Sequence, residues 1–203
     1  GTGVLDSISV FYHGTPSQSG FGSFSQVFHS GTPVISTLSE PYGSSDWWPC
    51  KDGLTDKIDS IEVFVLVPSG NKAASNGVLL SETIQGNNVL NHWKHKHPIV
   101  PYLIAVAVTN YVAYSEFANS SKGEPVEILN YVYPEHLSII QEVTPLLIPS
   151  FEYFDQVFIP YPYSDEKYGH AQFNWGGGME HQTMTFLGVY NFDILTHELA
   201  HQW

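Results

Sequence analysis

The sequence predicts an α+β protein in which an antiparallel β domain comes first and a more helical part follows. Short apolar runs, separated by glycine, proline and serine turns, recur up to about residue 118, as is typical of antiparallel strands. After a polar stretch at residues 119–123, apolar residues begin to recur at helical spacing, which predicts packed helices. We therefore divide the chain into domains over residues 1–118 and 119–203.

The strands of the first domain differ in how strongly the sequence marks them. The clearest is residues 59–67, where polar and apolar residues alternate before a β-branched run that ends at Pro68,. Partial alternation predicts an earlier strand over residues 5–12, and the glycine- and serine-rich residues 20–31 predict a hairpin or loop,. Further strands are predicted over residues 78–83, 88–94 and 102–114.

The second domain mixes both kinds of pattern. Residues 126–133 predict one more strand, and from residue 135 apolar side chains recur on one helix face,. Thr144 followed by Pro145 predicts that a new helix begins there, with threonine as the N-cap. Residues 172–175 are strand-like and run into three glycines.

Composition excludes some classes of partner. The formal net charge is −13, and the seven basic residues are all lysines, so we expect no nucleic-acid partner. An acidic field favours cationic ligands such as a peptide with a free amino terminus. Cys50 is the single cysteine, which excludes an intramolecular disulfide, and no apolar run is long enough to span a membrane,. An acidic, tyrosine-rich chain without arginine favours a secreted or bacterial-envelope setting, although the sequence does not fix the localisation.

The pattern H-E-x-x-H near the C-terminal end carries the most specific chemistry. On a helix, His197 and His201 project from one face and can bind one zinc ion together,. Glu198 is then placed to take a proton from a water on that zinc. Asn191 or Asp193 can cap this helix. The alternative is a core helix that carries two histidines by chance.

Three consecutive glycines form the second informative stretch. Gly176, Gly177 and Gly178 follow a strand-like segment and allow another backbone to approach closely,. An exposed strand edge of this kind can pair with an extended peptide. Glu180 follows at once and can bind a cation. The alternative is an ordinary glycine turn with a solvated glutamate.

Taken together, these motifs resemble the gluzincin aminopeptidases, the zinc metallopeptidases that include alanyl-aminopeptidase and leukotriene hydrolase. The chain has G-G-M-E, a short segment and then H-E-L-A-H-Q-W. Residues 46–52 (DWWPCKD) resemble the family's Pro-Cys-x-Asp core, residues 75–77 its Ser-Asn-Gly turn, and residues 101–105 the strand that closes its first domain. The resemblance implies a saddle-like antiparallel domain followed by the first part of a thermolysin-like catalytic domain.

The resemblance implies a role for each residue of the two motifs. His197 and His201 would be zinc ligands, with one zinc per intact site, and Glu198 the general base. The parent enzyme would then release N-terminal residues from peptides. A leukotriene-type epoxide hydrolase, or a non-catalytic protein that binds peptides or partners on the same scaffold, is an alternative function.

The remaining implied roles concern the substrate. Glu180 and Glu40 would bind its free α-ammonium group, which disfavours an endopeptidase. Gly177 and Gly178 would offer backbone groups to its chain. His181 stands where the family usually has asparagine, and a ring N–H there can replace the amide that contacts the scissile carbonyl.

The sequence opens on Gly-Thr-Gly and stops at Trp203, so we expect a fragment of a longer protein. The family's third zinc ligand, a glutamate on the next helix, and its transition-state tyrosine would both lie beyond Trp203. A catalytic zinc site normally has three protein ligands. We therefore expect this fragment to bind zinc weakly or not at all and to be inactive.

Overall fold

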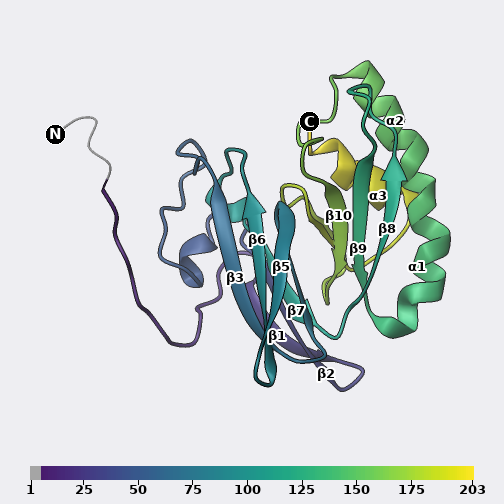
Figure 1. Ribbon diagram of the computed structural model, residues 1–203. Helices are drawn as coiled ribbons and strands as arrows, with labels where there is room; N and C mark the ends of the chain where they lie inside the picture. Colours follow the sequence, from purple (N-terminus) through teal and green to yellow (C-terminus); the bar gives the residue numbers. More distant parts are fainter. Residues whose placement is uncertain (1–5) are drawn as a thin grey trace.

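The computed structural model describes residues 6–203, which form three sheets and a small set of helices (Figure 1). The first two sheets are antiparallel, as the sequence predicts. One has the order β1-β2-β7-β4 and the other the order β3-β6-β5. Their strands are β1 (Ser23–His29), β2 (Thr32–Leu38), β3 (Ile61–Pro68), β4 (Lys72–Ser75), β5 (Val78–Gln85), β6 (Asn88–His95) and β7 (Val106–Thr109).

Two predicted strands of this part differ from the structure. Residues 6–12 form no strand, and Leu5 lies outside the described residues. Alternation of apolar and polar residues favours a strand, but a strand also needs a neighbouring strand to pair with. The single strand predicted over residues 102–114 is divided into a 3₁₀ turn, η2 (Pro101–Leu103), then β7, and then β8 (Val112–Ala118).

The third sheet has five strands in the order β11-β12-β10-β9-β8. β9 (Val126–Val132), β10 (Tyr168–Gln172) and β12 (Thr185–Leu187) are parallel to one another. β8 pairs with β9, and β11 (Gly178–Met179) pairs with β12, both in antiparallel fashion. Because β8 belongs to this sheet, the chain changes sheets at Asn110–Tyr111, ahead of the domain boundary predicted near residue 118. The boundary itself stays a prediction.

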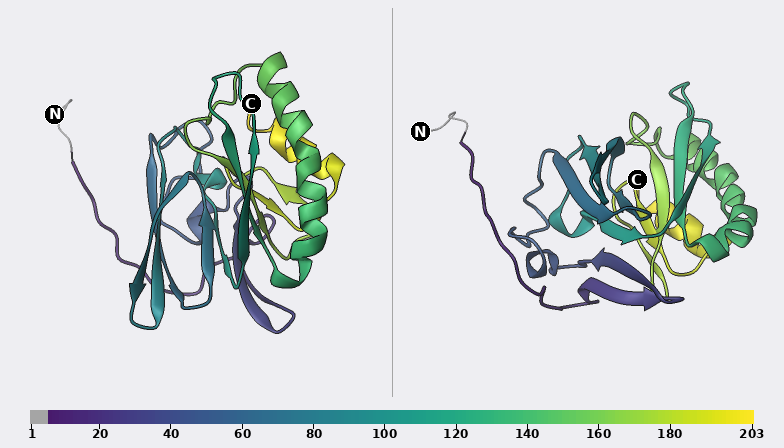
Figure 2. Two further views of the ribbon diagram at one scale, coloured as in Figure 1. Left: turned by 45° about the vertical axis from the view of Figure 1, so that its right-hand side comes forward. Right: turned by 60° about the horizontal axis from the view of Figure 1, so that its bottom comes forward.

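Helices cover one face of the five-stranded sheet, on the side away from the N-terminal sheets (Figures 1 and 2). The helical run comprises η3 (Pro134–His136), α1 (Leu137–Val143), η4 (Thr144–Leu147) and α2 (Ile148–Val157), and α3 (Phe192–Ala200) lies beside it. The predicted N-cap at Thr144 is wrong, because its hydroxyl donates to Ile140 O and Glu116 Oε1 and the helix tightens into η4 without a break. Leu147, Leu195 and Leu199 share one core with the sheet.

The opposite face of the five-stranded sheet packs against the N-terminal sheets. Trp93 and Ala107 from that side meet Tyr131, Tyr133 and Phe186 in a second continuous core. A remaining short 3₁₀ turn, η1 (Ser44–Asp46), follows β2. Within residues 6–203, no helix combines the length and the apolar character that crossing a membrane requires.

Candidate active site

Helix α3 presents both histidines of the H-E-x-x-H motif on its exposed side. Of the two predicted N-caps, Asn191 is the one found, since its side-chain oxygen accepts a hydrogen bond from the Ile194 amide at 3.0 Å,. Leu195 and Leu199 are fully buried in the core, which fixes the rotation of the helix. His197 lies in the last turn of the helix, and His201 is the C-cap residue that follows Ala200.

The two imidazoles are arranged as a pair of metal ligands would be. His197 Nε2 and His201 Nε2 lie 3.2 Å apart, with the rings nearly perpendicular at 78°. Two nitrogens bonded to one tetrahedral zinc at about 2.0–2.1 Å lie about 3.3 Å from each other. These residues therefore fit zinc. Among residues 6–203, no group of three or more histidine, cysteine or carboxylate side chains could hold a metal ion.

The Glu198 side chain is buried, and its carboxyl group packs against Gly178. Its Oε2 atom has no hydrogen-bond partner among the described residues, an unusual state for a buried oxygen. Burial raises its pKa to about 7, and the nearby carboxylates of Glu180 and Glu40 add to the effect. Such a carboxyl group exchanges a proton readily near neutral pH.

Glu40 and Glu180 bring two further carboxylates to this place from different sheets. Glu40 follows β2 and Glu180 follows β11. The pKa of Glu40 is raised by partial burial and by Glu180, whereas His201 lowers it. Tyr102 donates a hydrogen bond from its hydroxyl to Glu180 Oε1 at 3.3 Å, and burial raises the pKa of this phenol to about 12. The site thus concentrates negative charge that a cation would relieve.

Tyr102 is a site residue that sequence reasoning missed. The sequence places Tyr102 within residues 101–105, which resemble a strand, and nothing in it indicates a contact with Glu180. In the structure it lies in the turn η2, which directs its side chain towards Glu180.

The segment from Glu180 to Thr183 is held by hydrogen bonds on several sides. Asn76 donates to Gln182 O at 2.7 Å. Thr183 has φ of 66°, and its amide donates to Gln202 Oε1 at 2.8 Å. The Thr183 carbonyl accepts a hydrogen bond from the buried Lys167 ammonium group at 2.7 Å. These contacts position Glu180 relative to the helix that carries the histidines.

Strand β11 forms a free edge beside Glu198. The strand predicted over residues 172–175 differs from the structure, because β10 ends at Gln172 and the edge strand begins only at Gly178. β11 lies at the end of its sheet, and β12 is its one neighbour in the described chain. Gly177 O accepts a hydrogen bond from Gly188 N at 2.8 Å, so the antiparallel pattern turns the Gly178 amide and carbonyl outward. A β-carbon on Gly178 would collide with the Glu198 carboxylate.

The predicted substrate contact of His181 is not supported. Its ring is completely buried and packs edge-on against Phe186, 4.5 Å between ring centroids. Burial lowers its pKa to about 3. The His181 amide donates to Met179 O at 2.9 Å, so the chain turns tightly at Glu180 and the His181 ring enters the core. The other predicted residues are brought together: Glu40, Gly177, Gly178, Glu180, His197, Glu198 and His201.

Comparison with solved structures gives this arrangement a context. The M1 zinc metallopeptidase from Deinococcus radiodurans superposes with a TM-score of 0.75 and 22% sequence identity, over 94% of this chain and 44% of that one. A mutant of a two-domain M1 zinc metallopeptidase bound to L-arginine gives 0.76, and a mutant of the Deinococcus radiodurans protein bound to a Tyr-Ser-Ala substrate gives 0.74, each at 22% identity and the same coverage. No family model and no curated protein matches the sequence.

The likeness confirms the predicted α+β fold. The chain spans 44% of the length of these solved structures. Over 94% of its own length, the chain has the two-domain fold of the M1 zinc metallopeptidases.

Proposed function

We propose that this chain belongs to a zinc-dependent aminopeptidase that releases N-terminal residues from peptides. One observation supports it above all. Two imidazole nitrogens, 3.2 Å apart, lie beside three carboxylates at the end of a free strand edge. Solved structures with a similar fold include M1 zinc metallopeptidases, and a mutant of one of them is bound to a Tyr-Ser-Ala substrate.

His197 and His201 would hold the zinc through their Nε2 atoms. A bound zinc ion polarises a carbonyl and makes water more acidic. Glu198, whose pKa is raised to about 7, accepts a proton from the attacking water. It then returns that proton to the leaving amine. Its Oε2 atom has no competing hydrogen-bond partner among the described residues.

Glu40 and Glu180 would bind the free α-ammonium group of the peptide. Each offers a carboxylate to the cation, and charge-assisted hydrogen bonds of this kind are short and strong. Tyr102 fixes Glu180 through its hydroxyl group. A chain that continued beyond the amine would have to bury these carboxylates unpaired, so the site favours the first residue of a peptide.

We further propose that the 203-residue chain alone binds zinc weakly and does not hydrolyse peptides. The described residues supply two imidazoles, whereas catalytic zinc sites have three protein ligands and a water. Isothermal titration of the chain with zinc is expected to show weak binding that His197→Ala abolishes. Tight one-to-one binding would contradict this proposal.

The test of the function uses the longest natural polypeptide that contains this sequence. Aminoacyl-arylamides are incubated with it, with and without a chelator, beside Glu198→Gln. We expect chelator-sensitive release that falls at least about a hundredfold in the variant and disappears for N-acetylated substrates. Absence of release from every substrate by zinc-loaded protein would favour a peptide-binding role instead.

A further inference from the structure

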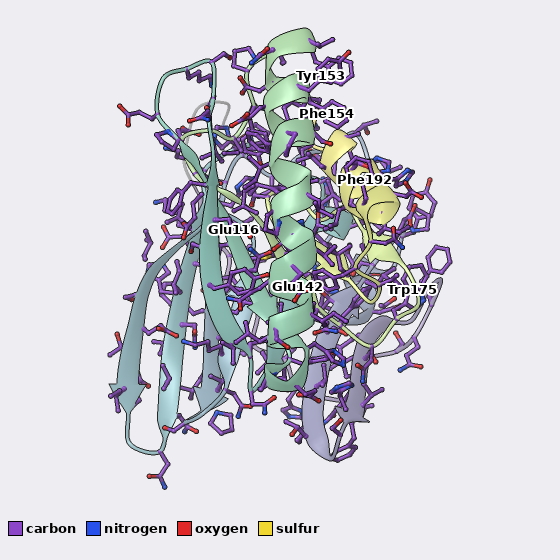
Figure 3. All side chains as sticks on the ribbon, turned by 90° about the vertical axis from the view of Figure 1, so that its right-hand side faces the viewer. Glu116, Glu142, Tyr153, Phe154, Trp175 and Phe192 are labelled. Atoms are coloured by element: carbon purple, nitrogen blue, oxygen red, sulfur yellow. The ribbon has the colours of Figure 1, made fainter. Side chains whose placement is uncertain are left out.

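Two exposed aromatic rings lie next to the free edge of β11. Trp175 precedes the strand, and Phe21 comes from the segment before β1. Their ring centroids are 5.8 Å apart, with one ring edge-on to the other at 69°. Their exposed fractions are 39% and 54%, so each ring keeps a large apolar surface open. Figure 3 shows Trp175 at the margin of the molecule, near α3 and the β1–β2 strands.

The direction of a bound peptide follows from the charges at the site. Glu180 lies at the C-terminal end of β11, and its carboxylate would bind the amino terminus. A peptide paired with the edge then runs antiparallel to β11, from Glu180 towards Gly177. Gly178 packs against the Glu198 carboxylate, so the scissile bond lies at the level of Gly178.

The spacing then places a particular residue of the peptide beside Trp175. Each residue of an extended chain advances about 3.3 Å, so the residue after the scissile bond lies opposite Gly178 and the next one opposite Gly177. The Trp175 ring folds back over Gly177, where a β-carbon would touch the ring. The third residue of the peptide therefore reaches the Trp175 ring.

Phe21, from the N-terminal part of the chain, lies opposite the Trp175 ring. A β-carbon on Gly20 would lie 2.8 Å from the Glu40 carbonyl oxygen, so Phe21 directly follows a residue that touches the amine-binding side of the site. Phe21 and Trp175, whose rings contact each other, both line a cavity of about 140 Å³ that extends towards Ser36 and Leu38 of β2. A cavity of about 150 Å³ is large enough for benzene.

We propose that Trp175 and Phe21 form a subsite for an uncharged aromatic side chain at the third residue of the peptide. The proposal rests on the proposed aminopeptidase function. The residues that line the cavity carry no charge, so an acidic or basic side chain would lose its hydration without a partner. Leu38 and Phe173 supply apolar contact, and Ser23, Ser25 and Ser36 can meet a tyrosine hydroxyl.

The test measures binding, so it does not depend on turnover. In the Glu198→Gln background of the longest natural polypeptide, isothermal titration compares amidated Ala-Ala-Phe, Ala-Ala-Ala and Ala-Ala-Asp. We expect Ala-Ala-Phe to bind roughly threefold to tenfold more tightly than Ala-Ala-Ala, and Ala-Ala-Asp to bind more weakly than both. Trp175→Ala and Phe21→Ala should each remove most of the preference for phenylalanine and leave the affinity for Ala-Ala-Ala unchanged.

Control variants separate the subsite from a folding defect. Trp175→Phe keeps an aromatic ring and should keep part of the preference. Phe117→Ala removes an exposed ring from β8, the far edge of the same sheet, and should change nothing. A preference that survives in both alanine variants, or none in the parent, would overturn the subsite.

A further peptide separates this failure from failure of the function itself. N-acetyl-Ala-Ala-Phe lacks the ammonium group that Glu40 and Glu180 would bind. Equal binding of the acetylated and free peptides, or no binding of either, would contradict the aminopeptidase proposal. Binding that needs the free amine but ignores the third residue would contradict the subsite alone.

Discussion

His181 and Lys167 are both buried in the fold under conditions that oppose their charged forms. His181 has no hydrogen-bond partner for either ring nitrogen among the described residues, and burial lowers its pKa to about 3. Burial lowers the pKa of Lys167 to about 7, although Glu166 and Glu127 act in the opposite direction. Each residue therefore binds fewer protons in the folded state than in the unfolded state over a wide pH range.

We expect His181→Phe to stabilise the protein by about 1 kcal/mol at pH 7.5, because it removes two unpaired polar atoms from the core. The unfolded histidine binds a proton below about pH 6.5, whereas the folded one does not until about pH 3. Parent stability therefore falls as pH drops through this window, and the advantage of the variant should grow by about 2 kcal/mol at pH 5. Urea unfolding at both pH values measures this.

His170→Phe is the matched control for that substitution. His170 is equally buried, but its Nδ1 atom forms a hydrogen bond with Asn130 Oδ1 at 2.8 Å. Its replacement leaves the buried Asn130 oxygen without that partner and should destabilise the protein at pH 7.5. Equal destabilisation by His181→Phe would mean that the His181 ring forms a hydrogen bond in the folded protein.

Lys167→Met should change how stability depends on alkaline pH. Between about pH 7 and 10.5 the unfolded lysine holds a proton that the folded one releases, so parent stability rises with pH in this window. The variant lacks this rise. The unfolding free energy of the parent, relative to that of the variant, should therefore increase by on the order of 3 kcal/mol between pH 7 and 10. Lys122→Met, at an exposed position, is the control. Parallel curves for Lys167→Met and the parent would contradict the assignment.

Sequence reasoning at the residue scale identified side chains by type and spacing but not by direction. It found His197, Glu198 and His201 because their spacing on one helix fixes their geometry,. It did not predict that the His181 ring is buried, because no sequence pattern marks the tight turn at Glu180 that directs this ring into the core. It missed Tyr102 because the contact with Glu180 joins positions 78 residues apart.

At the scale of elements, β11 combines a free edge with a close packing requirement. Gly176 and Gly178 differ in how much space a side chain would have. A β-carbon on Gly178 would collide with Glu198, whereas a β-carbon on Gly176 would meet no atom within 4 Å. The absence of a side chain matters at one of these positions and not at the other.

Gly178→Ala should therefore displace the Glu198 carboxylate and reduce arylamide release at least about tenfold, since misplacing a catalytic group by about 1 Å costs more than that. Gly176→Ala should leave release within about twofold of the parent. Rates and thermal unfolding of both variants in the longest natural polypeptide provide the measurement. Equal losses would mean that the strand needs glycine for its backbone conformation.

The elements themselves were predictable where local chemistry decides them. One of the two predicted caps, Asn191, is found, and the strand predicted over residues 126–133 is present as β9, Val126–Val132. The pairing of β8 with β9 was not predicted, because alternation marks a strand without naming its partner. The unpaired residues 6–12 show the same limit.

At the scale of the whole molecule, Asn76 joins the N-terminal sheets to the segment that carries Glu180. Its side chain is fully buried, donates to Leu103 O and Gln182 O, and accepts from the Ala105 amide. Gly77 follows with φ of 74°, and a β-carbon there would collide with the Lys94 carbonyl. The order of the motifs predicted that both parts exist, but their junction depends on contacts that no local pattern shows.

Asn76→Ala should cost about 3 kcal/mol of unfolding free energy, because it leaves several buried backbone groups unpaired. It should also speed hydrogen exchange of the Thr183 amide, since the segment around it loses an anchor. Asn71→Ala, which removes a single side-chain hydrogen bond to Pro68 O, should cost less than about 1 kcal/mol. Equal costs would show that the junction is held by apolar packing alone.

The junction at Asn76 also has a consequence for the timing of biosynthesis. The side chain and its partner at Gln182 are 106 residues apart. A ribosome adds about 5–20 residues each second, so Asn76 is synthesised roughly 5 to 20 s before its partner. During that interval the surface that later faces the five-stranded sheet stays open to solvent or to a chaperone. Glu40, which we propose as an amine ligand, is therefore synthesised early, but it becomes part of a site only after α3 has left the ribosome.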